Sequence, residues 1–301
     1  MTRRSWMLFS AMCVIWGIPY LLIRVAVRDV SPPALVFART FLGALVLLPI
    51  ALKRDAIRPV LPLWRPLLAF TAIEIAIPWL LLNDAETKLP SSLTGLLIAA
   101  VPMVGVVIAR FGPTKERVDA TRLAGLLLGV VGVVALLGLD LGNVQARPIL
   151  EVGLVVIGYA VAPVILNRHL SGVPGIGVVF TSLAITAAAY LPAAAVMRPH
   201  HLHANTVASI VALALICTAL AFVLFFELIA AIGPSRAVVI TYVNPAVAVL
   251  LGVLLLDESF TVGMAIGFPL ILAGSVLAAR TRRSQDPVPI GVPEPVAATG
   301  A

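Results

Sequence analysis

Ten apolar runs, each about as long as a membrane-crossing helix, dominate this chain. A helix needs about 20 apolar residues to cross the hydrocarbon core of a bilayer. Of the 301 residues, 61% are hydrophobic and 12% are charged, so a water-soluble globule would lack a polar surface. The sequence therefore predicts an all-α polytopic membrane protein with ten transmembrane helices. We expect them at residues 6–28, 32–52, 66–83, 89–109, 121–139, 150–170, 175–197, 205–230, 233–256 and 261–280.

The two ends of the chain carry different signals. The first apolar run follows Arg3 and Arg4 and in this respect resembles a signal peptide. No cleavage site of the A-x-A kind follows it, however, and the next run begins almost at once, so we interpret it as the first helix. Residues 281–301 are rich in proline and alanine and have little to bury, which predicts a disordered tail.

The positive charges between the apolar runs predict the orientation. If the N-terminus is cytoplasmic, fifteen lysines and arginines fall inside and five outside, and only Arg39 falls within a span. Cytoplasmic loops are enriched in such residues, so we expect both termini inside and an even number of helices in a plasma or inner membrane. The basic residues form no continuous patch, and nucleic acid is therefore not an expected partner.

Two segments of the chain resemble each other. "LPSSLTGLLIAAVPMVGVVIARFGPTKER" in the first half corresponds to "IGPSRAVVITYVNPAVAVLLGVLLLDES" in the second, with Pro102 opposite Pro245 and Glu116 opposite Glu258. Such self-similarity indicates an internal repeat. We expect one repeat over residues 1–140 and another over 150–280. Because each holds five helices, the second copy is inverted in the membrane, an architecture typical of secondary transporters with a site near the midplane.

These paired segments resemble the EamA-type repeats of the drug/metabolite transporter superfamily. "VIWGIPYLLIRVAV" and "PPALVFARTFLGALVLLP" are similar to the first two helices of that family. The resemblance covers about residues 6–280 and implies ten helices and secondary transport, often export, of small metabolites or amino acids. It implies no substrate. The "GPTKERVD" loop of the first copy departs from the usual pattern.

The two aligned prolines are expected to kink their helices near the middle. Proline has no backbone N–H, so Pro102 and Pro245 each leave one helical carbonyl without its donor. Such breaks are tolerated where they face protein or a water-filled cavity. Tyr242 and Asn244 flank the second kink, and we interpret them as substrate-cavity residues; the alternative is a kink that only shapes packing. Asp257 and Glu258 are interpreted as ending their helix at the outer interface.

Two charged residues are expected deep in the membrane, where charges are costly and usually functional. From the helix rise, Arg39 lies roughly 10 Å and Glu74 roughly 13 Å from the outer ends of their helices. One interpretation is a mutual ion pair; another is a proton- or substrate-coupling role for Glu74, and the two are compatible. Glu227 lies nearer the cytoplasmic end of its helix and is interpreted as interfacial.

Trp16 and Tyr159 occupy equivalent positions in the two repeats, and each precedes a proline. Aromatic rings with polar edges suit a cavity for amphipathic ligands, and core packing is the alternative. Small-residue spacing in "AGLLLGVVG" and "VGMAIGFP" predicts close helix packing, either within the chain or in a homodimer.

The sequence gives little support for ATP hydrolysis, metal binding or enzymatic hydrolysis. The chain has no G-x-x-x-x-G-K-[ST] loop for nucleotide, so ATP-driven transport is unsupported and no cofactor is expected. His200, His201 and His203 lie close together, but a solvated loop is favoured over a metal site. Ser182 and Thr186 lack a histidine at their depth, which disfavours an intramembrane hydrolase. The sequence predicts a secondary transporter, with a channel as the alternative and an enzyme as the more remote one.

Overall fold

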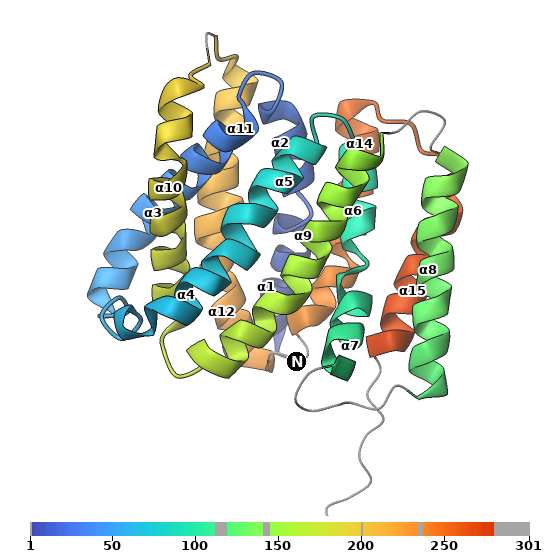
Figure 1. Ribbon diagram of the computed structural model, residues 1–301, viewed down its shortest axis with the longest axis horizontal. Coiled ribbons are helices and arrows are strands. Elements are labelled where there is room, and N and C mark those ends of the chain that lie inside the picture. The colour runs from blue at the N-terminus through green and yellow to red at the C-terminus, as the bar shows by residue number, and fades with distance from the viewer. Residues whose placement is uncertain (1, 112–118, 141–144, 200, 234–236, 280–301) are drawn as a thin grey trace, which may run out of the picture.

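The computed structural model describes residues 2–111, 119–140, 145–199, 201–233 and 237–279, and every regular element in these ranges is a helix (Figure 1). The first half contains α1 (Arg3–Ile15), α2 (Pro19–Ala26), α3 (Pro32–Lys53), η1 (Leu61–Leu63), α4 (Trp64–Phe70), η2 (Thr71–Ala76), α5 (Ile77–Ala85), α6 (Ser91–Ile98), α7 (Val101–Phe111) and α8 (Ala120–Asp140). The second half contains α9 (Ala146–Ile165), η3 (Leu166–Leu170), α10 (Gly175–Val196), α11 (Ala204–Ala214), η4 (Leu215–Leu220), α12 (Ala221–Ile232), η5 (Val238–Tyr242), α14 (Asn244–Leu256) and α15 (Val262–Ala279).

These elements join into membrane-crossing units that we number as spans. Span 1 is α1–α2, span 2 is α3, span 3 runs from η1 to α5, span 4 is α6–α7 and span 5 is α8. Span 6 is α9–η3, span 7 is α10, span 8 runs from α11 to α12, span 9 is η5–α14 and span 10 is α15. In the described part of the chain, nine helices are long and apolar enough to cross a membrane, and the apolar helix of span 10 is shorter. The predicted polytopic all-α fold is confirmed.

The packing of the spans repeats between the halves of the chain. Span 2 packs on span 7, span 4 on span 9, and span 5 on span 10, while span 1 packs on span 8 and span 3 on span 6. If each span is replaced by the equivalent span of the other repeat (span 1 by span 6, span 2 by span 7, and so on), the same five pairs are obtained. That is the layout of two five-span repeats, and five is odd, so equivalent spans run in opposite directions, as α8 and α15 do in Figure 1. Every one of these pairs joins one repeat to the other.

Helix irregularities also recur in both repeats. Span 4 is interrupted at Ala99–Ala100, two residues before Pro102, and span 9 changes from η5 to α14 at Val243, directly before Asn244 and Pro245. A proline inside a helix removes one backbone donor and crowds the preceding turn, which explains both interruptions. Spans 3 and 8 instead each contain a π-helical turn, η2 and η4, whose first residues lie 144 positions apart in the chain.

Spans 5 and 10 meet along glycines. A Cβ added at Gly125 would lie 2.5 Å from the backbone nitrogen of Ala278, and one at Gly274 would lie 2.4 Å from that of Gly129. One at Gly132 would lie 2.7 Å from the backbone nitrogen of Ile271. The two backbones therefore touch with no side chain between them, as small residues allow in membrane helices. This glycine seam, formed by Gly125, Gly129, Gly132, Gly267 and Gly274, shows the predicted close packing within the chain.

Replacing Gly274 with Ala is expected to destabilise the protein. The added methyl group meets the backbone of α8, which cannot rotate away, and overpacking costs about 1–3 kcal/mol. Gly138→Ala on the same α8 is the matched control, because no described atom lies within 4 Å of its added Cβ. Thermal unfolding of detergent-purified protein should show a lower midpoint for Gly274→Ala only; equal midpoints would contradict backbone contact at the seam.

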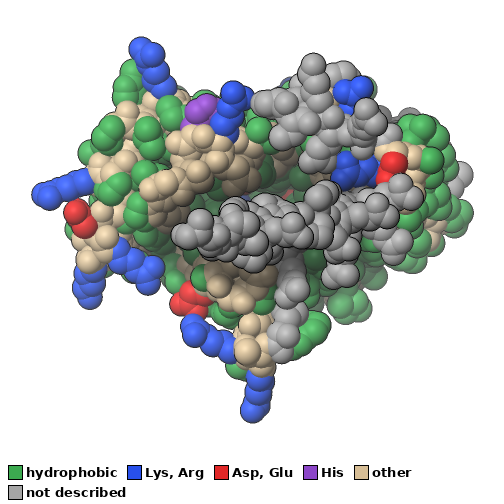
Figure 2. Space-filling view, turned by 90° about the horizontal axis from the view of Figure 1, so that it is seen from below, with side chains coloured by type: hydrophobic (Ala, Val, Ile, Leu, Met, Phe, Trp, Pro, Cys, Tyr) green, Lys and Arg blue, Asp and Glu red, His purple; other side chains and the backbone are tan. Residues whose placement is uncertain are grey.

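The two ends of the bundle differ in their side chains. The N-terminus and the end of α15 lie at the lower end of Figure 1. Figure 2 shows this face, with lysine and arginine side chains projecting around its rim. Arg4 Nη2 lies 2.9 Å from Glu227 Oε2 and joins span 1 to span 8 at this end. The predicted tail at 281–301 and the loop that contains Glu116 lie outside the described residues.

Candidate functional site

Arg39 is a buried charged residue that contacts both repeats. Its side chain extends from α3 and is 6% exposed. Its Nε donates a hydrogen bond to Thr218 Oγ1 over 2.9 Å, and its guanidinium carbon lies 3.7 Å from the centre of the Trp79 ring. Thr218 belongs to η4, in the other repeat. Arg39 therefore connects spans 2, 3 and 8, and its two terminal nitrogens make no hydrogen bond to the described residues.

The predicted ion pair between Arg39 and Glu74 is not formed. No described carboxylate lies within ion-pair distance of Arg39, and Glu74 lies in the π-helical turn η2. Similar depth does not make two side chains face each other: the Arg39 guanidinium contacts Trp79 of span 3 and Thr218 of span 8 instead. Thr218 lies 144 positions after Glu74, so in the second repeat it stands where Glu74 stands in the first.

The corresponding spans of the other half, spans 7 and 3, are joined by uncharged groups. Thr71 Oγ1 of η2 donates to Ser182 Oγ of α10 over 2.8 Å, and Ser182 lies 143 positions after Arg39. Thr186 donates to the backbone carbonyl of Ser182 over 2.8 Å. These hydroxyls are buried and hydrogen-bonded. Ser182 and Thr186 are thus fixed by hydrogen bonds between buried groups of spans 3 and 7.

Two tyrosines face the same region as Arg39. Tyr159 of α9 packs against the buried cluster that contains Tyr20 of α2, and also against the cluster that contains Trp79, over which Arg39 lies. We call Tyr20, Arg39, Trp79, Tyr159 and Thr218 the central polar cluster. Its members come from spans 1, 2, 3, 6 and 8, so both repeats contribute. Arginine and aromatic edges together can hold an anionic or amphipathic molecule.

The other predicted aromatic, Trp16, is placed elsewhere. Its ring lies 4.6 Å from that of Phe225 and 6.1 Å from that of Phe222, centroid to centroid, in α12. Trp16 packs with the buried residues of α1 and α12. The structure therefore does not bring Trp16 and Tyr159 together, although the repeat makes their positions equivalent.

The helix interruptions are tied together by side chains. Asn244 is 9% exposed, and its amide nitrogen donates to the carbonyls of Ile240 (2.9 Å) and Cys13 (3.0 Å) once the amide is oriented to satisfy both. It thus joins the break in span 9 to span 1. Tyr242 and Ala99 both contact Ser275 of α15: Tyr242 Oη lies 3.4 Å from the Ser275 carbonyl, and Ser275 Oγ donates to the Ala99 carbonyl over 2.9 Å. Protein groups therefore satisfy carbonyls that these breaks expose.

Glu258 makes a contact that sequence reasoning missed. Asp257 ends α14 in the left-handed conformation (φ 55°), and the Glu258 N–H bonds back to the Gly252 carbonyl. This turn directs the Glu258 carboxylate onto the start of α6. It accepts bonds from Ser91 N (2.7 Å), Ser92 N (2.9 Å) and Ser92 Oγ (2.5 Å). We call this contact the Glu258 cap.

The Glu258 cap replaces an intrahelical cap. The first N–H groups of a helix lack partners, and the helix dipole favours an anion there. The N-cap position of α6 is Pro90, which offers no side-chain acceptor. The carboxylate that serves α6 therefore comes from the other repeat. In the sequence, the only indication of this contact was that Glu258 recurs as Glu116 in the first repeat. No sequence pattern identified the start of α6 as the partner of Glu258.

Glu86 was also missed. It follows directly after α5, is 0% exposed, and neither carboxylate oxygen has a hydrogen-bond partner in the described part of the chain. Arg24 of α2 donates to the Glu86 backbone carbonyl and not to its carboxylate. A buried, unpartnered carboxylate is rare because its charged form is costly.

The histidine-containing loop is held by an acid. Asp29 Oδ2 lies 2.8 Å from His203 Nδ1 and accepts bonds from His203 N and Thr206 Oγ1. These bonds, from Thr206 first and His203 next, lower the pKa of Asp29 to about 2, so this carboxylate is ionised at neutral pH. Among the described residues no group of three or more histidines, cysteines or acids is arranged for a metal, and His200 lies outside them.

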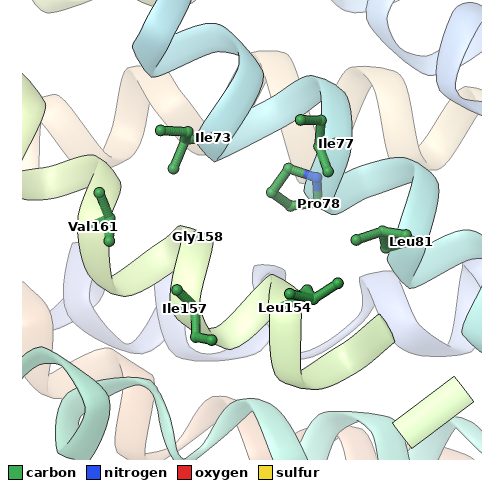
Figure 3. A pocket seen from close by; sticks show the side chains of 8 residues that line it. All are labelled: Ile73, Ile77, Pro78, Leu81, Leu154, Ile157, Gly158 and Val161. Carbon is green, nitrogen blue, oxygen red and sulfur yellow. The ribbon is translucent and has the colours of Figure 1, made fainter. Parts of the chain in front are cut away.

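Two cavities of the described structure are apolar. One of about 230 Å³ lies between span 3 and α9, where Ile73, Ile77, Pro78 and Leu81 face Leu154, Ile157, Gly158 and Val161 (Figure 3). The other, of about 320 Å³, lies beside α3 and the end of α10. Ile77, Leu154 and Ile157 are about half exposed, as expected for side chains that face lipid. Neither cavity is lined by the central polar cluster.

Comparison with known proteins decides the family. The EamA-like transporter family matches residues 4–138 and again residues 148–280. The chain belongs to the EamA-like transporter family. The predicted membership is confirmed, and the two matches fit the two-repeat layout of the spans.

Relatives of this EamA-like protein are named as transporters. One is an uncharacterized transporter from Archaeoglobus fulgidus, 22% identical over 93% of this chain and 100% of that protein. Another is the uncharacterized transporter YvbV from Bacillus subtilis strain 168, 23% identical over 98% of this chain and 97% of that protein. A solved crystal structure covers 91% of this chain and 96% of its own, with a TM-score of 0.65 and 21% identity, and so shares the fold.

Proposed function

We propose that this EamA-like protein is a secondary-active transporter that exports small metabolites or amino acids by alternating access. The observation that carries the proposal is the pairing of every span with a span of the other repeat. Rocking one inverted repeat against the other opens a midplane site to each side in turn. The central polar cluster and the interrupted spans 4 and 9 lie between the repeats and supply the groups that such a site needs.

The proposed orientation places the face in Figure 2 in the cytoplasm of a cell with an inner or plasma membrane. The basic rim of that face supports it through the positive-inside rule. Single cysteines at Arg58 and Ser259, both exposed, report the two faces in a background without Cys13 and Cys217. An impermeant thiol reagent outside intact cells should label the cysteine at Ser259 alone. Equal labelling would contradict the orientation.

The activity is tested in proteoliposomes. Thermal shift of the purified protein against a panel of metabolites and amino acids first selects a ligand, and flux of that ligand is then measured. Saturable exchange supports a carrier, an ohmic current a channel, and a new product an enzyme. The family and the relatives are named as transporters, which supports transport over catalysis. We expect saturable counterflow, and its absence with every selected ligand would contradict the proposal.

Coupling to protons is part of the proposal. Glu74 is an intramembrane carboxylate without an ion-pair partner among the described residues, and such residues mark proton relays in transporters. If Glu74 carries the coupled proton, Glu74→Gln abolishes uptake driven by a pH gradient and preserves exchange at equal pH. Since Arg39 and Glu74 form no ion pair, this variant should fold as well as the wild type.

A further inference from the structure

The carboxylate of Glu86 lies where the two repeats meet at the end of the molecule opposite the N-terminus. This end, which we call the Glu258 face, also contains the Glu258 cap. Both Glu86 oxygens are buried and lack a hydrogen-bond partner among the described residues, so no described donor stabilises a negative charge there. A carboxyl group in such surroundings takes up a proton and becomes neutral.

The charged groups around Glu86 come from three elements. Arg24 of α2 and Arg39 of α3 are the cations, Glu258 after α14 is the anion, and Tyr20 of α2 is the remaining titratable neighbour. Burial raises the pKa of Glu86 well above its usual range; Arg24 opposes this shift, Glu258 adds to it and Arg39 opposes it. The Glu258 cap therefore holds a negative charge close to Glu86, and that charge favours the protonated form.

We propose that Glu86 is a proton-binding site that is loaded when the Glu258 face closes. This inference rests on alternating access as proposed above. In the arrangement described here, which we take as the closed one, the Glu86 carboxyl group is fully buried. When the repeats separate at this face, the cap leaves α6, water reaches Glu86, and the proton is released to that side.

The sign of the effect follows from linkage. A group that holds its proton more tightly in the closed state stabilises that state at low pH. The stabilisation is lost as pH rises through the pKa of the closed state. Acidity on the outside therefore favours closure of the Glu258 face, and for one titrating group the ratio of closed to open molecules changes at most tenfold per pH unit.

The test measures the opening of this face directly. Nitroxide labels are placed at Lys88→Cys and Ser259→Cys, in protein that lacks Cys13 and Cys217, and their distance distribution is recorded in nanodiscs from pH 5 to pH 9. Both label sites are exposed and lie on different repeats. In otherwise wild-type protein we expect a short distance at low pH and a growing long-distance population as pH rises.

Substitutions of Glu86 test whether this residue causes the pH response. Glu86→Gln, which resembles the protonated form in shape and charge, should hold the short distance at every pH. Glu86→Leu should also hold the short distance at every pH, and it provides the test if the Glu86→Gln protein does not fold. Asp257→Asn is the matched control, because it removes an exposed carboxylate of the same face, keeps a residue that tolerates the left-handed conformation, and should keep the wild-type response.

Three outcomes overturn the inference: a pH response that persists without Glu86, a wild-type distance that ignores pH, or open Glu86→Gln protein at low pH. No substrate is used, so the proposed transport is judged separately. Flux without a pH response contradicts only the role of Glu86. A pH response that depends on Glu86, in protein without flux, contradicts only the transport proposal.

Discussion

Replacing Glu258 with Ala is expected to open the Glu258 face. The substitution removes the acceptor of Ser91 N, Ser92 N and Ser92 Oγ and leaves the start of α6 uncapped. Hydrogen bonds to a charged group contribute about 1.5–3 kcal/mol, so the loss of the cap should shift the closed-to-open ratio by about 2 kcal/mol, or about thirtyfold. The spin-label distances across this face, recorded at low pH, measure the shift.

Two variants act as controls for Glu258→Ala. Ser259→Ala changes the exposed neighbour and no bond of the cap, so it should leave the distances unchanged, with the label moved to Phe260. Ser92→Ala removes only the hydroxyl contact and should give a smaller shift, because both backbone donors remain. A closed face in Glu258→Ala would show that the cap does not hold the repeats together.

Replacing Arg39 with Met should separate stability from transport. Arg39 is a buried cation without a carboxylate partner among the described residues, and such a charge destabilises the fold. Met keeps much of the apolar volume against Trp79, and Thr218 Oγ1 keeps its own acceptor, the Leu213 carbonyl. We expect an unfolding temperature equal to or above that of the wild type, together with a loss of substrate exchange of at least about tenfold.

Arg39→Lys refines this result. A lysine retains the charge but lacks the planar group that lies over Trp79 while donating to Thr218. Its exchange rate should fall between those of the wild type and Arg39→Met. A large drop in the unfolding temperature of Arg39→Met would assign Arg39 a structural role, and normal exchange would remove it from the site.

The sequence predicts the spans well because hydrocarbon imposes a length and a composition on each of them. Pro102 and Pro245 also mark the interruptions, since the missing N–H acts wherever the helix lies. The hydrogen-bond partners of polar side chains are harder to predict from the sequence, because they depend on the direction in which each helix face points. Depth alone paired Arg39 with Glu74, whereas the structure pairs it with Thr218.

The contacts missed at the Glu258 face have a local cause. The sequence "LLLDES" indicates the end of a helix, but a left-handed Asp257 then decides where Glu258 points. Nothing in the chain specifies that conformation, since aspartate adopts it only occasionally. In the sequence, Glu86 stands directly after a helix, where a charged side chain is usually solvated. Its burial results from the packing of three other elements, which no local pattern contains.

The glycine seam restricts how the two repeats move. Spans 5 and 10 belong to different repeats, yet their backbones touch at Gly125, Gly129 and Gly274. Sliding by one residue would bring a larger side chain against the facing backbone, and a tightly packed interface does not deform continuously. Rolling about the line of contact leaves the glycines opposed. In the alternating access proposed above, we therefore expect the seam to act as a hinge axis, with an amplitude of opening that grows with distance from spans 5 and 10.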